Sequence, residues 1–128
     1  MPANYRIMVV DDDRLGRSLL ATLLGNDGYQ VTEAGGGDDA LIKLRQNQFD
    51  AIITDLRMPG MDGATLAKHV RSLHTKDALL TAPPRLIALS ASLGGIDASE
   101  SSNEIFDVLL QKPVALAELV AVLESGTE

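Results

Sequence analysis

The sequence contains no cysteine, which excludes disulfides and thiol chemistry. Aromatic residues make up only 3% of it although hydrophobic residues make up 45%, so the core has to be built from Leu, Ile, Val, Ala and Met. No apolar run approaches the roughly 18 residues that a membrane-spanning helix needs, and the N-terminus lacks the apolar stretch of a signal peptide. The net charge of −7 argues against direct contact with nucleic acid. We expect a soluble, cytoplasmic domain without membrane contact.

What is present is an alternation of short apolar runs with longer segments of helical periodicity. The 128 residues, 1–128, suit one domain with its core over about residues 6–124. The apolar runs predict five strands: Arg6–Val10, Tyr29–Glu33, Ala51–Asp55, Leu86–Ala91 and Val108–Gln111. A helical segment follows each strand, so the order is βα repeated five times. This order predicts a doubly wound α/β fold with a five-stranded parallel sheet covered on both faces.

The helical segments carry start and stop signals. Four leucines share one face of the first helix: Leu15, Leu19, Leu23 and Leu24. Asn26–Gly28 is expected to end that helix, because Asn and Gly tolerate the left-handed conformation. Asp38 or Asp39 is expected to cap the second helix. Asp97–Phe106 predicts a weak, polar fourth helix, and Leu116–Leu123 predicts an unusually apolar last one.

Polar residues gather where the predicted strands end. The first strand ends in Asp11–Asp13, the third in Asp55, the fourth in Ser90 and the fifth in Lys112. The second strand ends in Glu33, at the edge of the sheet. In an open parallel sheet the functional crevice lies at the carboxyl ends of the strands. We therefore expect these carboxylates, the hydroxyl and the ammonium group to converge on one rim.

Such a group of residues has the chemistry of a phosphoryl-transfer site. Two unit charges 4 Å apart repel by about 4 kcal/mol at an effective dielectric near 20, so converging carboxylates need a cation, and Mg²⁺ suits hard oxygen ligands. Lys112 supplies a point charge for a phosphoryl oxygen and Ser90 a hydrogen bond. Asp55 stands alone in mid-sheet and is the best candidate nucleophile. Taken singly, each residue has an ordinary explanation as a cap or a turn. Only their conjunction favours a site.

The segments IMVVDDD, ITDLRMPGMDG, IALSA and LLQKP resemble the receiver domain of two-component response regulators. The resemblance implies a flavodoxin-like (βα)5 fold with strand order 2-1-3-4-5. It implies that Asp55 is phosphorylated, that Asp12 binds Mg²⁺ or Mn²⁺ directly, that Asp11 does so largely through water, and that the backbone carbonyl of Arg57 completes the metal site. Ser90 would bond the phosphoryl group and Lys112 would neutralise it. Asp13 matches nothing required and is expected to cap a helix.

The resemblance also implies partners. The phosphoryl donor would be a phosphohistidine on a histidine kinase or a histidine phosphotransfer protein. The family often docks that partner on the first helix, here at Leu15, Gly16 and Ser18–Leu20. The apolar last helix could serve as a dimer surface. The length of the stretch His74–Arg85 resembles the receivers attached to hybrid histidine kinases.

The sequence departs from the family pattern at one switch position. The family usually carries Tyr or Phe three residues before the lysine, where this chain has Leu109. The coupled movement of a hydroxyl (Ser90) and an aromatic ring is therefore in question. Arg57 and Ser92, each two residues beyond a site residue, are expected to tune hydrolysis.

Two other functions remain open. One is an aspartyl-phosphate hydrolase of the haloacid dehalogenase type, an enzyme that the short chain and the Lys-Pro element disfavour. The other is a receiver-like scaffold that binds partners without phosphorylation, which Leu109 keeps open although Asp12, Asp55 and Lys112 are all present. The preferred hypothesis is a phosphoacceptor that catalyses its own phosphorylation and dephosphorylation, not an enzyme acting on a free metabolite.

Overall fold

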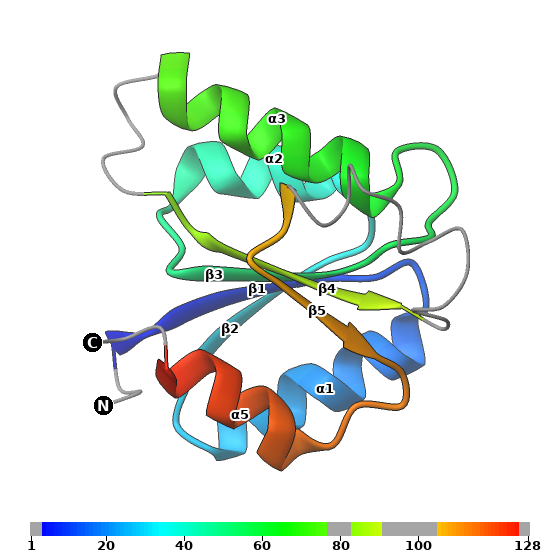
Figure 1. The fold of residues 1–128 in the computed structure, drawn as a ribbon, viewed down its shortest axis with the longest axis vertical. Coiled ribbons are helices and arrows are strands. Elements are labelled where there is room, and N and C mark those ends of the chain that lie inside the picture. Colours follow the sequence, from blue (N-terminus) through cyan, green and yellow to red (C-terminus); the bar gives the residue numbers. More distant parts are fainter. Residues whose placement is uncertain (1–3, 77–82, 91–104, 126–128) are drawn as a thin grey trace.

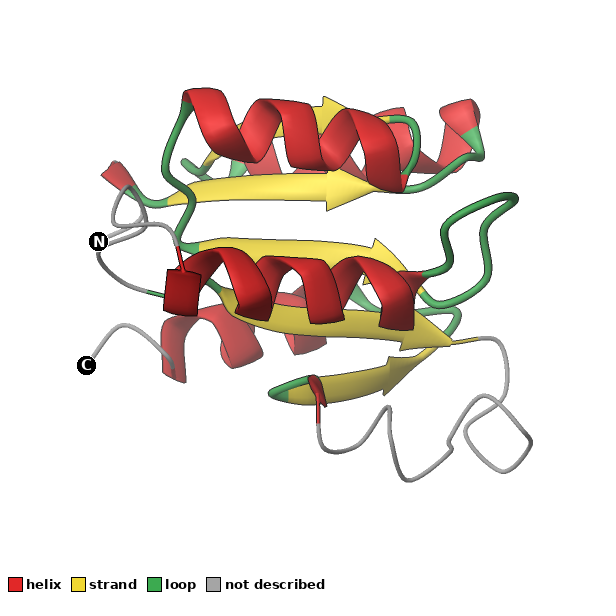
Figure 2. Cartoon of the chain, turned by 90° about the horizontal axis from the view of Figure 1, so that it is seen from above, coloured by secondary structure: helices red, strands yellow, loops and turns green. Residues whose placement is uncertain are grey.

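Five parallel strands form one sheet in the order β2-β1-β3-β4-β5 (Figure 1). The structure, a computed structural model, describes residues 4–76, 83–90 and 105–125. The strands are β1 (Arg6–Val10), β2 (Gln30–Ala34), β3 (Ala51–Asp55), β4 (Arg85–Ser90) and β5 (Val108–Gln111). Their arrowheads all point to one edge of the sheet, as Figure 2 shows. The predicted fold class and strand order are confirmed.

Three strands have the predicted bounds and two are shifted by one residue. β2 begins at Gln30 because the backbone N–H of Tyr29 still bonds the carbonyl of Leu24, at the end of the preceding helix. β4 begins at Arg85 because its N–H donates to the carbonyl of Asp50. The shifts do not alter which residues reach the carboxyl ends of the strands.

Helices cover both faces of the sheet. They are α1 (Arg14–Asn26), α2 (Gly37–Gln46), α3 (Gly63–Lys76) and α5 (Leu116–Ser125). Helices α2 and α3 lie on one face, and α1 and α5 lie on the other (Figure 1). The predicted fourth helix, Asp97–Phe106, lies outside the described residues except for its last two positions. Among the described residues, none of the helices is long and apolar enough to cross a membrane.

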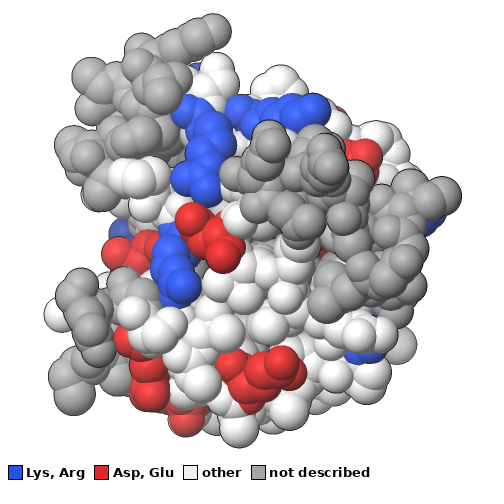
Figure 3. Space-filling model, in the orientation of Figure 1, with Lys and Arg blue, Asp and Glu red and all other residues white. Residues whose placement is uncertain are grey.

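The sheet separates two aliphatic cores. Met8 and Ile52 point to the side of α2 and α3, whereas Ile7 and Ile53 point to the side of α1 and α5. This alternation follows from the two-residue period of a strand, and both kinds of side chain are fully buried. The two helix layers also differ in charge: basic side chains gather over α3 and acidic ones over α5 on the face seen in Figure 3.

The outward face of α1 differs from an ordinary core-facing stripe. The prediction that four leucines share one face is wrong: Leu24 is fully buried, whereas Leu15 is 83% and Leu19 is 62% exposed. Leu20 and Leu24, four residues apart, pack against the sheet instead. The shared periodicity of the leucines therefore marks a partly solvent-facing apolar surface.

The helix ends confirm one prediction and correct another. Helix α1 ends at Asn26, and Gly28 has a φ of 104°, in the left-handed region that the sequence led us to expect. Helix α2 is preceded by Gly36 as its N-cap, not by Asp38 or Asp39. It starts earlier than predicted, at Gly37, so both aspartates fall in its first turn, where the helix dipole favours negative charge.

The large apolar side chains of α5 are used inside the domain. Leu119 and Leu123 are fully buried, and Leu116, Val120 and Val122 pack against the same core. The dimer surface predicted on this helix stays a prediction.

Candidate functional site

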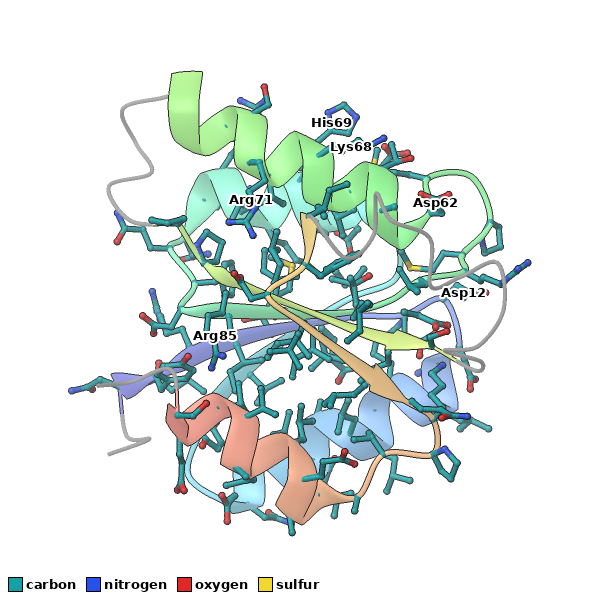
Figure 4. The ribbon with its side chains drawn as sticks, viewed as in Figure 1. Asp12, Asp62, Lys68, His69, Arg71 and Arg85 are labelled. Carbon is teal, nitrogen blue, oxygen red and sulfur yellow. The ribbon has the colours of Figure 1, made fainter. Side chains whose placement is uncertain are left out.

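Three carboxylates meet at the carboxyl ends of the two central strands. Asp11 and Asp12 follow β1, Asp55 ends β3, and β1 pairs directly with β3. One oxygen from each of the three lies within 4.8 Å of the others. Asp12 lies at this edge of the sheet in Figure 4. The structure therefore brings together the three acidic side chains that the sequence singled out.

Lys112 reaches this cluster from β5. Its Nζ lies 3.2 Å from an oxygen of Asp55 and 3.9 Å from an oxygen of Asp11. Its backbone N–H donates to the carbonyl of Ser90 at 2.7 Å, which extends the β4–β5 pairing to the end of the strands. The long lysine side chain thus starts from a fixed backbone position and spans β4 to reach the acids.

The carboxyl group of Asp55 is held in an environment that disfavours its charge. Its side chain is 17% exposed, and burial raises the pKa of Asp55 above its ordinary value. The hydrogen bond and charge of Lys112 oppose that rise, while the charges of Asp11 and Asp12 add to it. A single ammonium group therefore does not compensate the three acids, and the site retains a demand for positive charge.

Ser90 and Thr54 are the two buried polar residues among those described. Ser90 is 1% exposed and ends β4, next to Leu89, which pairs with Asp55 across the sheet. Thr54 was not predicted as a site residue. Its hydroxyl donates to the carbonyl of Asp55 at 2.9 Å and so restrains the peptide that follows the carboxylate.

The loop after β3 is tightly fixed at both ends. The N–H of Gly63 donates to the carbonyl of Leu56 at 2.9 Å, and a Cβ on Gly63 would clash with the carbonyl oxygen of Asp55. Asp62 caps α3, because its side-chain oxygen accepts from the N–H of Thr65 at 2.8 Å. The exposed Arg57 lies within this loop, two residues beyond Asp55.

Asp13 lies at the N-terminus of a helix as predicted, but its side chain does not cap that helix. It is the N-cap residue of α1, yet its side chain makes no capping hydrogen bond. Its backbone N–H instead donates to a side-chain oxygen of Asp11 at 3.0 Å. Its carbonyl accepts from the backbone N–H of Arg17. Asp13 therefore shapes the turn that carries the acids through its backbone.

The switch positions are only partly described. Leu109 is half-buried and packs against the core on the side of α2 and α3. Phe106 is buried in that same core, at the start of the segment entering β5. Ser92 lies outside the described residues.

Sequence reasoning missed a polar network behind the acids. Arg17 on α1 pairs with Glu33 at the end of β2 at 2.9 Å and also donates to the backbone carbonyl of Asp11 at 2.9 Å. Glu33 was placed at the edge of the sheet, but its partner on α1 could not be read from spacing, because the contact depends on how α1 packs beside β2.

A groove of 450 Å³ lies beside the acidic cluster, between α1 and the segment after β5. Asp11 and Lys112 line one end of it. Its remaining lining is mainly apolar and includes Leu19, Leu23 and Pro113. Two exposed leucines of α1, Leu19 and Leu23, therefore border the same depression as Asp11 and Lys112.

Comparisons with known proteins agree with this geometry. Residues 7–124 match the family model of the response regulator receiver domain. The sensor histidine kinase RcsC of Escherichia coli (strain K12) is 38% identical over 110 residues, which cover 86% of this chain and 11% of the kinase. The response regulator MprA of Mycobacterium sp. (strain KMS) is 37% identical over 116 residues, which cover 91% of this chain and 47% of the regulator. The chain thus spans less than half the length of these relatives.

Solved structures show the same fold. A CheY-like response regulator receiver domain from Methylobacillus flagellatus has a TM-score of 0.86 and 27% identity, with 96% of this chain and 98% of that chain covered. The response regulator TrrA of Thermotoga maritima, in complex with Mg²⁺-BeF, has a TM-score of 0.78 and 29% identity, with 95% and 98% covered. The chain belongs to the response regulator receiver domains, the phosphoacceptor modules of two-component signalling.

Proposed function

We propose that Asp55 is the residue of this chain that accepts the phosphoryl group, and that Lys112 and Ser90 stabilise it there. The observation that carries the proposal is the position of the Asp55 carboxylate, beside two further acids and 3.2 Å from the Lys112 ammonium. A nucleophile, a neutralising cation and a demand for a second cation are thereby combined at one edge of the sheet.

The donor set fits a divalent metal ion. Asp11, Asp12 and Asp55 offer carboxylate oxygens within 4.8 Å of one another, and hard oxygen ligands in small number suit Mg²⁺ or Mn²⁺. The carbonyl of Arg57 is a further proposed ligand from the loop after β3. When bound, the metal would neutralise charge on the acids and on an incoming phosphoryl group. The Mg²⁺-BeF complex of the similar TrrA protein supports this assignment.

In the proposed reaction one bond to phosphorus forms and one breaks. An oxygen of Asp55 attacks the phosphorus of a phosphohistidine, the P–N bond breaks, and the imidazole nitrogen keeps the electron pair. The product is an acyl phosphate on Asp55, which water later hydrolyses. Lys112 is placed to compensate charge on the transferring group, and the buried Ser90 hydroxyl is the proposed hydrogen-bond donor to it. Arg57 and Ser92 remain proposed tuning positions for hydrolysis.

The phosphodonor is proposed to be a histidine kinase or a histidine phosphotransfer protein, bound on α1. Leu15 and Leu19 are largely exposed there, and Leu19 lines the groove that leads to Asp11 and Lys112. A partner resting on these leucines would bring its histidine toward the acids. A cytoplasmic location belongs to the same proposal, since a histidine kinase takes its phosphoryl group from ATP.

The test is phosphorylation by acetyl phosphate, read by intact mass. We expect a single phosphoryl gain that requires Mg²⁺, disappears in Asp55→Asn and persists in Asp13→Asn, a matched loss of one negative charge from the neighbouring turn. A phosphoryl gain that persists in Asp55→Asn would mean that a residue other than Asp55 is the nucleophile. No gain in the wild-type protein, combined with no binding of beryllofluoride, would favour the scaffold that works without phosphorylation.

A further inference from the structure

Arg17 bridges the ends of two neighbouring strands behind the acidic cluster. Its Nε lies 2.9 Å from an oxygen of Glu33, at the end of β2, and its Nη1 donates to the carbonyl of Asp11 at 2.9 Å. The arginine side chain is 16% exposed and that of Glu33 is 38% exposed, so water screens the ion pair in part while the guanidinium group itself is mostly covered. One planar guanidinium group therefore fixes the peptide that joins Asp11 to Asp12.

The acidic partner of Arg17 is itself held in place. Ser18 donates its hydroxyl to the same oxygen of Glu33 at 2.9 Å, and Lys43 on α2 donates to the backbone carbonyl of Glu33 at 2.5 Å. Hydrogen bonds from Arg17 and Ser18 lower the pKa of Glu33, so its carboxylate stays charged over the neutral range. Lys43 is in turn paired with Asp39 at 3.0 Å. The anchor of Arg17 is thus fixed from α1 and from α2.

The backbone of Asp11 is restrained on both sides. Its N–H donates to the carbonyl of Ala34 at 3.2 Å, and its carbonyl accepts from Arg17. The carboxylates of Asp11, Asp12 and Asp55 repel one another, and this repulsion favours any movement of the turn that separates them. A restraint on the peptide between Asp11 and Asp12 opposes such movement before a metal ion binds.

We propose that Arg17 is a positioning residue that holds Asp11 and Asp12 in the metal-binding arrangement, an inference that rests on the proposed metal site. Arg17 touches neither the metal ligands' carboxylates nor the phosphoryl site in the described contacts. It acts through the backbone of Asp11. Residues that orient metal ligands in this indirect way change metal affinity by about 10- to 100-fold when they are removed.

The charge of Arg17, taken alone, predicts that removing this residue changes Mg²⁺ affinity in the opposite direction. Removing a positive charge near three carboxylates leaves the site more negative, so electrostatics alone would strengthen the binding of a divalent cation. Positioning predicts that binding weakens. Lysine keeps the charge but cannot reproduce the fork that reaches Glu33 and the Asp11 carbonyl together. The direction of the change and the behaviour of the lysine variant therefore separate geometry from charge.

The experiment measures Mg²⁺ affinity by calorimetry in the wild-type protein, Arg17→Gln, Arg17→Lys and the control Arg14→Gln, which removes the same charge from an exposed site on α1. We expect binding about tenfold weaker in both Arg17 variants and within twofold of wild type in Arg14→Gln. In the metal-free proteins we expect faster amide exchange at Asp11 and Asp13 in the Arg17 variants by NMR, with the amides of β3 unchanged.

The outcomes are distinct. Unchanged or tighter Mg²⁺ binding in Arg17→Gln would overturn the inference and leave the metal site standing, as would full recovery in Arg17→Lys. If wild type itself binds no Mg²⁺, the proposed function fails and the inference fails with it. If an Arg17 variant is globally destabilised, exchange will be faster in β3 as well, and that result would assign Arg17 a structural role.

Discussion

At the scale of single residues, the folded protein is less stable when the carboxyl group of Asp55 is ionised than when it is protonated. Its raised pKa means that the folded state binds a proton more tightly than the unfolded state does. The stabilisation that protonated Asp55 gives the folded state is complete below the pKa that Asp55 has in the unfolded chain. It is lost as the pH rises through the pKa that Asp55 has in the folded protein. At neutral pH the ionised carboxylate therefore destabilises the metal-free protein.

We accordingly predict that Asp55→Asn raises the Tm of the metal-free protein by a few degrees at pH 7. The difference from wild type should shrink as the pH falls through the pKa of Asp55, where the wild-type side chain also becomes neutral. Thermal unfolding followed by circular dichroism measures this, with Asp13→Asn as the exposed control. A Tm below that of wild type at pH 7 would show that the lost contact with Lys112 outweighs the relief of burial and repulsion.

Lys112 gives a second prediction at this scale. Because its hydrogen bond and charge hold the pKa of Asp55 down, Lys112→Ala should raise that pKa further above the ordinary aspartate value. A ¹³C NMR titration of the Asp55 carboxyl group in metal-free protein measures the change directly. An Asp55 that titrates identically in both proteins would mean that the 3.2 Å contact has no energetic weight.

The main acidic and basic residues of the site could be predicted from the sequence, and the network behind them could not. Asp11, Asp12, Asp55 and Lys112 follow apolar runs, and the carboxyl ends of parallel strands share one edge. The contacts of Arg17 with Glu33 and the Asp11 carbonyl depend on the rotation of α1 about its axis. That rotation follows from core packing, and no single residue encodes it.

At the scale of elements, the start of α3 is set by the close approach of two backbones. A Cβ on Gly63 would clash with the carbonyl oxygen of Asp55, whereas a Cβ on Gly25 within α1 meets nothing within 4 Å. Gly63 is therefore required because a side chain would not fit there, whereas a side chain at Gly25 would fit.

We predict that Gly63→Ala destabilises the protein by about 1–3 kcal/mol, because the start of α3 must move away from β3. Gly25→Ala should be neutral or stabilising by about 0.5 kcal/mol, since alanine favours a helix. Denaturant titration of both variants measures the pair. Equal stability of Gly63→Ala and wild type would show that the loop after Asp55 yields without cost.

Element boundaries could be predicted well where the chain leaves little choice and less well at caps. The three strands β1, β3 and β5 have the predicted ends because their apolar runs are bounded by charged or polar residues. The start of α2 was predicted two or three residues late, since Gly36 supplies no side-chain signal. The four leucines of α1 were wrongly predicted to share one face, because Leu24 lies roughly half a turn around the helix from Leu15 and is the one that packs into the core.

At the scale of the whole molecule, the sheet is best protected at its centre. Four of the five residues of β1 are buried, whereas β2 and β5 at the two edges have mostly half-buried or exposed residues. We predict that native-state hydrogen exchange is slowest in β1 and β3 and distinctly faster in β2 and β5. Exchange as slow in β5 as in β3 would show that another surface covers that edge in solution.

The central sheet also has a consequence for how the sequence can change over evolutionary time. Side chains on its two faces belong to separate cores and do not pack against one another. Substitutions beneath α1 and α5 should therefore couple weakly to substitutions beneath α2 and α3, because the side chains of the two cores share no packing partners. The carboxyl ends of β1 and β3 are the expected exception, because their three acids offer oxygens within 4.8 Å of one another and substitutions there should couple.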